Sequence, residues 1–191
     1  MSVEAILNMM KQKGIGETAG GIVTDYSDII TGEILLGATV TMGGHQWVVC
    51  HIDYNGGVFY LLDAVVEETC QFGSNENYPN STLASKAAAF ESSLPSNVKD
   101  KLLTMNVSGV SAKVFVPTKA QYQGGFNLFS AEETDTGRVG YLNGVSTNVW
   151  TSSRYSASSS SGVWFVNTAG TFSNNSTTST AGFRPAVCLA L

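Results

Sequence analysis

Apolar residues near the start of the chain recur at the spacing of a helix. Residues 2–13 place Ile6 and Met10 on one side and Gly14 supplies an end, which predicts an amphipathic helix of about three turns. A glycine-rich connector over 14–37 follows it. Because one short helix cannot bury its own apolar face, we expect this helix to pack on the domain or on a neighbouring subunit.

Two strongly apolar runs, 45–53 and 58–66, predict the strands of a hairpin. The Asn-Gly-Gly sequence at 55–57 supplies the residues that a tight hairpin turn needs. A further short strand is expected at 38–42. Since both runs are apolar on both faces, we expect the hairpin to lie centrally in a sheet that is covered on each side.

Beyond the hairpin, short helices, short strands and polar stretches follow one another. A helix over 81–94 begins at an Asn80/Ser81 cap and ends before Pro95. The other elements expected are a helix at 96–103, strands at 112–116, 149–151, 162–167 and 183–191, and polar loops at 152–161 and 168–181. Strands, then helices, then strands indicate the α+β class.

Composition narrows the class of protein. A length of 191 residues corresponds to one domain with a short appendage, and 43% hydrophobic residues suffice for a core. The net charge of −5 argues against nucleic-acid binding, which needs a basic footprint. No apolar run reaches the length of a membrane span and no secretory signal is visible, so we expect no membrane insertion. Cys50, Cys70 and Cys188 are expected to be buried thiols.

Charge is distributed unevenly along the chain. All 15 acidic residues lie at or before Asp135, and every lysine lies at or before Lys119. After Arg138 there is no Asp, Glu, Lys, Gln or Met, and the only charges are Arg154 and Arg184. Serine, threonine, asparagine, glycine and scattered aromatic residues take these places. The requirements on this part of the chain therefore differ from those on the rest.

Sequence motifs near the end of the chain carry a resemblance. Trp150-Thr-Ser, then Val-Trp-Phe-Val-Asn-Thr-Ala-Gly from Val163, then Gly-Phe-Arg-Pro-Ala-Val from Gly182 occur in this order. The order resembles the C-type-lectin-like fold in its formylglycine-generating-enzyme-like branch, and a domain of unknown function common in Firmicutes and their phages. The resemblance covers 38–191 and implies small antiparallel sheets, two short helices and long loops. Residues 1–37 lie outside it.

Within that fold, the chain is similar to the variable proteins of diversity-generating retroelements, which resemble phage tropism determinants. There a reverse transcriptase rewrites adenines in a C-terminal repeat. Asparagine codons can then become codons for Ser, Thr, Tyr and others, but not for Lys, Glu, Gln, Met or Trp. The composition of 152–181 agrees with such a process. The resemblance implies a fixed scaffold of Trp150, Trp164, Gly170, Gly182, Arg184 and Pro185.

A variable ligand-binding surface is therefore expected in the loops of 143–181. Serine, asparagine and glycine with occasional aromatic residues are typical of binding surfaces that adapt to different ligands. Tyr155 and Phe165 are the expected aromatic anchors. The expected adaptable positions are Ser156, Ser158, Ser159, Ser160, Thr171, Ser173, Asn174, Asn175, Ser176 and Thr177. The alternative is a set of solvated polar loops that bind nothing.

Catalytic and metal sites are not expected. His45 and His51 would share a strand face about 20 Å apart, too far for one metal ion. No cysteine pair matches the copper site of the formylglycine-generating enzymes, and Cys188 is expected to be buried. The carboxylates at 132–135 could hold Ca²⁺ or form a solvated acidic turn, and the turn is the preferred interpretation. We expect no cofactor, no metal and no enzymatic activity.

The sequence thus predicts a ligand-binding display protein, with a structural virion or surface module without a diversified ligand site as the alternative. The resemblance implies a phage tail or fibre tip, or a bacterial cell surface, as location, a bacterial protein or glycan as receptor, and attachment through 1–37 to virion tail proteins as a homo-oligomer, plausibly a trimer. Arg184, in an apolar closing strand, is expected to hydrogen-bond loop carbonyls or a carboxylate, because an unpaired buried charge is costly.

Overall fold

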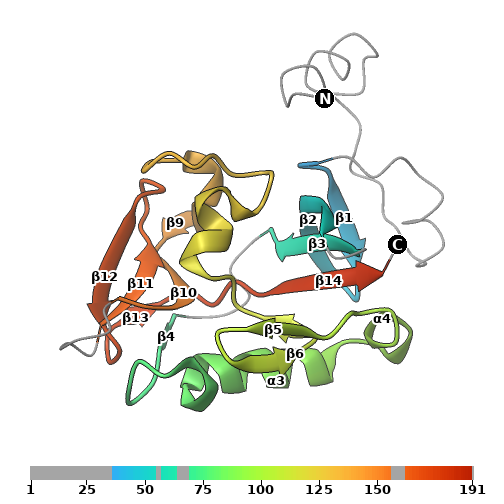
Figure 1. The fold of residues 1–191 in the computed structure, drawn as a ribbon, viewed down its shortest axis with the longest axis horizontal. Helices are drawn as coiled ribbons and strands as arrows, with labels where there is room; N and C mark the ends of the chain where they lie inside the picture. The colour runs from blue at the N-terminus through green and yellow to red at the C-terminus, as the bar shows by residue number, and fades with distance from the viewer. Residues whose placement is uncertain (1–35, 55–56, 64–68, 156–161, 191) are drawn as a thin grey trace, which may run out of the picture.

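A computed structural model describes residues 36–54, 57–63, 69–155 and 162–190 (Figure 1). The helix expected at 2–13 and nearly all of the connector expected at 14–37 lie outside the described residues. So do the tip of the hairpin turn and the last part of the strand expected at 58–66. Within the described ranges, no helix is long and apolar enough to cross a membrane.

The largest sheet has five strands, all paired antiparallel, in the order β1-β2-β3-β14-β7. Their bounds are β1 Thr39–Met42, β2 His45–Tyr54, β3 Gly57–Leu62, β7 Val114–Phe115 and β14 Ala186–Ala190. All six residues of β3 are buried, which confirms the central position expected for the hairpin. Strand β14 comes from the far end of the chain and lies between β3 and β7 (Figure 1).

Two apolar clusters cover the two faces of this sheet. One joins Trp47 and Tyr60 to Leu83 and Phe90 of α3, the helix Thr82–Ser93 that runs beneath β14 in Figure 1. The other contains Phe59, with the remaining members Val48, Cys50, Leu61, Val107, Phe115, Tyr122, Phe126, Phe129, Val166, Ala186 and Cys188. Burial on both faces explains why the strands carry no polar alternation.

Helix α3 has the start that its sequence predicts. The Ser81 hydroxyl accepts a hydrogen bond from the Ala84 amide at 3.0 Å, as an N-cap does. The following helix α4, Ser96–Lys99, is much shorter than the expected 96–103. The chain leaves the helix because Leu103 donates its amide to the Cys188 carbonyl at 2.8 Å, beside a bridge between Leu102 and Leu189. Pairing with β14 replaces the second half of the helix.

The second half of the chain forms several small antiparallel sheets. A three-stranded sheet has the order β10-β11-β12, with β10 Val149–Arg154, β11 Gly162–Val166 and β12 Phe172–Ser176. Two-stranded pairs are β5 Met105–Val107 with β6 Val110–Ala112, β8 Gly140–Leu142 with β9 Val145–Thr147, and β4 Cys70–Gln71 with β13 Thr180–Ala181. Single turns of helix are η1 Tyr78–Asn80, η2 Gln121–Gly125 and η3 Thr136–Arg138.

The prediction of two polar loops is therefore wrong in part. Strand β10 continues through Ser152 to Arg154, and β12 is a five-residue edge strand inside the segment expected to be a loop. Serine and asparagine are poor strand formers. They form a strand here because β11 offers its backbone for pairing and water solvates the outer edge. The described residues are thus a mixture of small antiparallel sheets and few helices, as the α+β prediction requires.

Trp150 joins the three-stranded sheet to the rest of the molecule. Its side chain is fully buried, its Nε1 donates to the Cys70 carbonyl at 2.8 Å, and its ring lies 5.8 Å from that of Phe72. Its amide donates to the Gly182 carbonyl at 3.1 Å. Trp150 and Gly182 therefore occupy framework positions, as the sequence resemblance implies.

Two arginines are buried without a carboxylate partner among the described residues. Arg184 donates from Nε to the Leu62 carbonyl at 2.7 Å and from Nη1 to the Arg138 carbonyl at 3.1 Å. Carbonyl acceptors are what the sequence predicts for Arg184. However, these carbonyls belong to β3 and η3, not to the polar stretches of 152–181.

Arg138 makes the contacts that were expected of Arg184. Its side chain is fully buried and donates to five carbonyls, those of Tyr122, Ser130, Glu132, Glu133 and Gly170. Burial lowers the pKa of this guanidinium from its ordinary value, and the nearby Asp135 carboxylate opposes that shift. Arg138 thereby ties the loop before η3 to the turn that leads into β12.

Candidate functional site

In the middle strand β11 of the three-stranded sheet, Val163 and Phe165 face the core and Trp164 faces solvent, whereas Val166 at the end of the strand is buried in the other apolar cluster. Antiparallel partners share a face, and the register pairs Trp164 with Asn174 and Gly162 with Ser176. The alternate residues Val163 and Phe165 belong to the buried cluster around Trp150. We call the solvent side the outer face, defined by Tyr155, Trp164, Asn174, Ser176 and Lys119.

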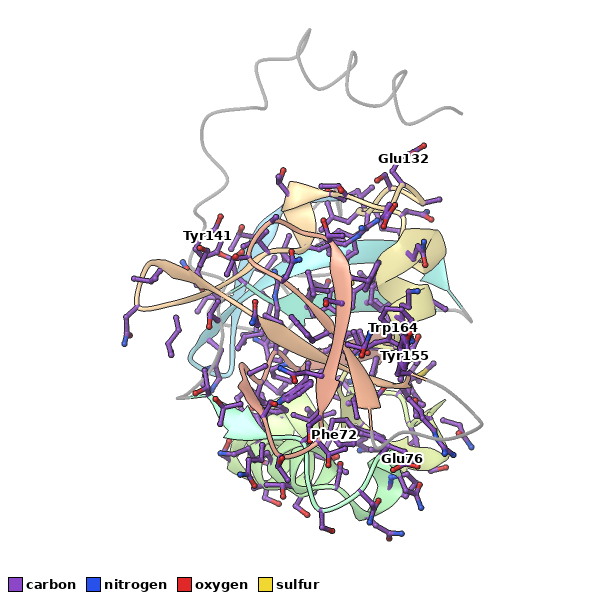
Figure 2. All side chains as sticks on the ribbon, turned by 90° about the vertical axis from the view of Figure 1, so that its left-hand side faces the viewer. Phe72, Glu76, Glu132, Tyr141, Tyr155 and Trp164 are labelled. Atoms are coloured by element: carbon purple, nitrogen blue, oxygen red, sulfur yellow. The ribbon has the colours of Figure 1, made fainter. Side chains whose placement is uncertain are left out.

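Aromatic and cationic side chains stack across the outer face. The Tyr155 ring lies 4.8 Å from the Trp164 ring at an angle of 64°, and Figure 2 shows the two side by side. The Lys119 ammonium sits 3.7 Å above the Trp164 ring and 5.3 Å from that of Phe172. The Lys119 amide donates to the Ser153 hydroxyl at 3.0 Å, which fixes the backbone of Lys119 against β10. The outer face therefore presents two stacked aromatic rings, Tyr155 and Trp164, with the positive charge of Lys119 above the Trp164 ring.

Tyr155 has the exposure that an aromatic anchor requires. It is 41% exposed, and within the described ranges the other exposed large hydrophobic residues are Tyr141 and Val145, on the β8–β9 hairpin. Figure 2 shows Tyr141 well away from Tyr155. The backbone of Tyr155 is fixed by its amide, which donates a hydrogen bond to the Gly162 carbonyl at 2.9 Å. An exposed ring on a fixed backbone loses little conformational entropy on binding.

Phe165 is not an exposed anchor, contrary to the sequence prediction. It is only 8% exposed, and its ring lies 6.1 Å from that of Trp150. Strand alternation is the reason, because Phe165 and Trp164 point to opposite faces. Trp164, expected to be a scaffold residue like Trp150, is half-buried and lies on the outer face.

The other expected positions divide by the register of β12. Asn174 and Ser176 are exposed on the outer face, whereas Asn175 is exposed and Ser173 half-buried on the opposite side of the strand. Thr171 is half-buried, with its hydroxyl 3.2 Å from that of Thr134.

Thr177 and the serines before β11 are the remaining positions expected to bind a ligand. Thr177 is 2% exposed, and its carbonyl accepts the Gly73 amide at 3.2 Å, so it is not a surface position. The positions that lie outside the described residues are Ser156, Ser158, Ser159 and Ser160. The structure thus brings together Tyr155, Asn174 and Ser176 from the expected set.

Lys119 and Trp164 are the outer-face residues that the sequence did not indicate as ligand-binding. Lys119 lies more than 30 positions before Tyr155, beyond the reach of spacing arguments. Trp164 shares its apolar run with buried residues on both sides. Only the register of β11 with β12 shows that Trp164 faces outward.

A pocket of about 520 Å³ lies at the end of β10. Three segments line it, namely Glu76 to Tyr78, Ser108, and Ser152 to Arg154. Arg154 and Glu76 form an ion pair across it at 2.8 Å. The lining is polar, and Ser153 links it to Lys119 on the outer face.

The two histidines do not share a face. A bulge between Val49 and His51 shifts the register of β2. As a result, the His45 ring lies 4.8 Å from Phe90 in one apolar cluster, whereas the His51 ring lies 6.3 Å from Phe59 in the other. The same-face expectation is wrong because it assumed unbroken alternation.

The side chains of Asp135 and the cysteines, which could serve in catalysis or metal binding, hydrogen-bond to the backbone or are buried in the core. The Asp135 carboxylate accepts the Ser130 amide at 2.7 Å and the Gly137 amide at 2.8 Å. All three cysteines are free and buried, as expected, and burial raises the pKa of Cys188 to about 11. No group of three histidine, cysteine or acidic side chains that could hold a metal ion occurs in the described parts of the chain.

Comparisons with protein-family models, curated proteins and solved structures find no match to this chain. The geometry of the outer face and of the pocket, together with the sequence motifs, is therefore the basis for proposing a function.

Proposed function

We propose that the protein is a non-enzymatic display protein of the C-type-lectin-like fold, whose outer face binds a receptor on a bacterial surface. The observation that carries the proposal is the stacked pair of exposed Tyr155 and half-buried Trp164, flanked by the exposed Asn174 and Ser176, on a sheet that packs Val163 and Phe165 into the core. Rigid aromatic anchors beside short polar side chains suit recognition. The small antiparallel sheets and the Gly-Phe-Arg-Pro-Ala motif support the fold.

The framework beneath this face supports the idea of a diversified surface. Arg138 and Arg184 together donate to the carbonyls of seven residues, five for Arg138 and two for Arg184, and Trp150 anchors β10. Asn174 and Ser176 are exposed on the outer face, so substitutions at these two positions should leave the fold intact. A phage tail or fibre tip is the setting that the resemblance implies, with 1–37 as the attachment and oligomerisation segment. A trimer would strengthen weak single-site binding by avidity.

Binding to cells tests the role of the outer face. Fluorescently labelled full-length protein is incubated with a panel of intact Firmicutes cells and bound protein is counted by cytometry. Tyr155→Ala is compared with Tyr141→Ala, which removes an equally exposed tyrosine, 46% against 41%, from a different part of the surface. We expect Tyr155→Ala to lose about tenfold in binding and Tyr141→Ala to bind like the parent protein. Equal binding by both variants, or no binding by the parent, contradicts the proposal.

The gene sequence tests diversification independently of binding. The proposal requires a near-copy of codons 143–187 beside a reverse-transcriptase gene, differing only at template adenines. Differences should concentrate in codons of exposed residues such as Tyr155, Asn174 and Ser176, and should spare the buried Val163 and Phe165. A neighbourhood with neither feature would favour the alternative, a structural module without a diversified ligand site.

A further inference from the structure

The pocket at the end of β10 is lined in part by the turn between β5 and β6. Ser108, in the turn between β5 and β6, has a φ of +50°, in the left-handed region where glycine or asparagine is favoured. Its neighbour Gly109 has a φ of +83°. Positive φ at both central residues is what a two-residue hairpin turn requires, and this turn brings Ser108 to the pocket.

The conformation of Ser108 directs its hydroxyl into the pocket. It donates to the Ser152 hydroxyl at 3.0 Å, and Ser152 is only 2% exposed. The Ser152 oxygen accepts this hydrogen bond, which leaves its own hydrogen for a further acceptor. The pocket lining therefore includes a hydroxyl pair in which Ser152 is buried and Ser108, from the turn of a different sheet, is exposed.

The ion pair on the pocket wall limits the charge of a ligand. Arg154 and Glu76 lie 2.8 Å apart, so their charges compensate each other. An anionic ligand would compete with Glu76 for Arg154, and a cationic ligand would compete with Arg154 for Glu76. A neutral ligand can accept from Arg154 and donate to Glu76 without breaking the pair.

The remaining lining selects for hydroxyl groups. Ser108, Ser152, Ser153 and Asn77 can each donate and accept, and the Asn77 side chain makes no capping bond to η1. Tyr78 is 3% exposed and its hydroxyl already accepts the Val116 amide at 3.2 Å. Burial raises the pKa of Tyr78 to about 12, so this wall stays uncharged. Polar groups of both kinds in a pocket of about 520 Å³ disfavour lipids and flat apolar molecules.

We propose that this pocket binds a neutral saccharide unit, whose hydroxyl groups donate and accept at once. The inference rests on the proposed function, because it names the class of ligand that the display surface meets on a cell. Ser153 lines the pocket and accepts the Lys119 amide at 3.0 Å, so the pocket adjoins the outer face and a glycan chain seated in it would reach that face. The pocket supplies a fixed contact beside a variable one.

Glycan binding by the full-length protein tests this inference. The protein is applied to an array of neutral hexose and N-acetylhexosamine oligosaccharides, with sialylated and sulfated glycans for comparison. The strongest neutral glycan is then titrated by calorimetry. Ser108→Gly relieves the turn and removes the hydroxyl, so we expect an unchanged or higher melting temperature and about tenfold weaker binding. Asn143→Gly is the matched control, because it also places glycine at a positive φ, +53°, but in the β8–β9 turn away from the pocket. It should bind like the parent protein.

Three results would overturn the saccharide pocket: no binding to neutral glycans, binding confined to anionic glycans, or equal affinity of Ser108→Gly and the parent. These results are separable from failure of the display function. Cell binding that depends on Tyr155 without any glycan binding retains the display function and removes the pocket. Glycan binding that depends on Ser108, by a protein that no cell retains, does the opposite.

Discussion

The five-stranded and three-stranded sheets share antiparallel pairing but differ in what covers their faces. Every residue of β3 is buried, and apolar clusters lie on both sides of its sheet. In the smaller sheet, Phe165 packs on the core whereas Trp164 and Asn174 face solvent. A strand covered on one side alternates between positions that hold the fold and positions that are open to change. The smaller sheet can therefore combine stability with recognition.

The largest expected effect comes from breaking the support of the smaller sheet. Arg138→Ala leaves five carbonyls without their donor, two of them in buried and three in part-buried hydrogen bonds, and should lower the free energy of unfolding by about 4 kcal/mol. Arg184→Ala, which affects two carbonyls, should cost about half as much. Urea unfolding followed by fluorescence measures both. Arg154→Ala, a partly exposed arginine, is the control and should stay within about 1 kcal/mol of the parent. Equal stability of all three variants would contradict this account.

The alternation within the smaller sheet predicts the next largest difference. Phe165→Ala leaves a cavity beside Trp150 and should destabilise by about 3 kcal/mol. Asn174→Ala, across from Trp164 on the outer face, should change stability by less than about 0.5 kcal/mol. Thermal melts and urea titrations of the pair provide the comparison. Comparable losses in both variants would mean that the outer face is part of the core.

Lys119 gives a smaller effect, because its contact with Trp164 is only partly shielded from water. Lys119→Met keeps most of the stem but removes the charge above the ring, and should cost about 1 kcal/mol. Lys119→Arg keeps a cation there and should cost less. Urea unfolding of the two variants separates charge from packing. A methionine variant as stable as the arginine variant would show that the cation does not stabilise the stack.

The smallest effect is a dependence of stability on pH in the larger sheet. Burial against Phe90 lowers the pKa of His45 below its ordinary value of about 6.5. The unfolded chain therefore binds the proton more readily, and stability contributed by neutral His45 is complete above about pH 6.5 and declines as the pH falls towards the folded-state pKa. His45→Gln should flatten the melting temperature between about pH 5 and 7. A parent protein with no such decline would exclude this contribution.

Residue patterns were sufficient for the parts of the fold with strong local signals. The hairpin follows from its apolar runs and the start of α3 from the capping chemistry of Ser81. The carbonyl partners of buried Arg184 follow from the cost of an unpaired buried charge, and Trp150 was expected in the scaffold from the sequence resemblance. Tyr155 and Asn174 were predicted to lie on the surface because the residues around them have the composition of a binding surface, and both are exposed. Local chemistry determines such positions.

Features that depend on distant partners could not be predicted in this way. The sequence around Arg138 does not show that five carbonyls from 122–170 meet its guanidinium. Strand β12 has weak strand propensity and exists because β11 pairs with it. The bulge after Val49, which separates the two histidines, and the Ser108–Ser152 contact across 44 positions likewise come from tertiary packing.

The location of β14 determines which variants of the 152–181 segment can fold. This strand is made after the polar segments of 152–181, yet it lies between β3 and β7. The larger sheet cannot close during synthesis until those segments have passed. A stop codon or frameshift within them removes β14, leaving two buried strand edges unpaired and the product open to proteolysis. Under the proposed diversification, a faulty rewriting would thus eliminate itself, and only in-frame variants would persist as folded protein.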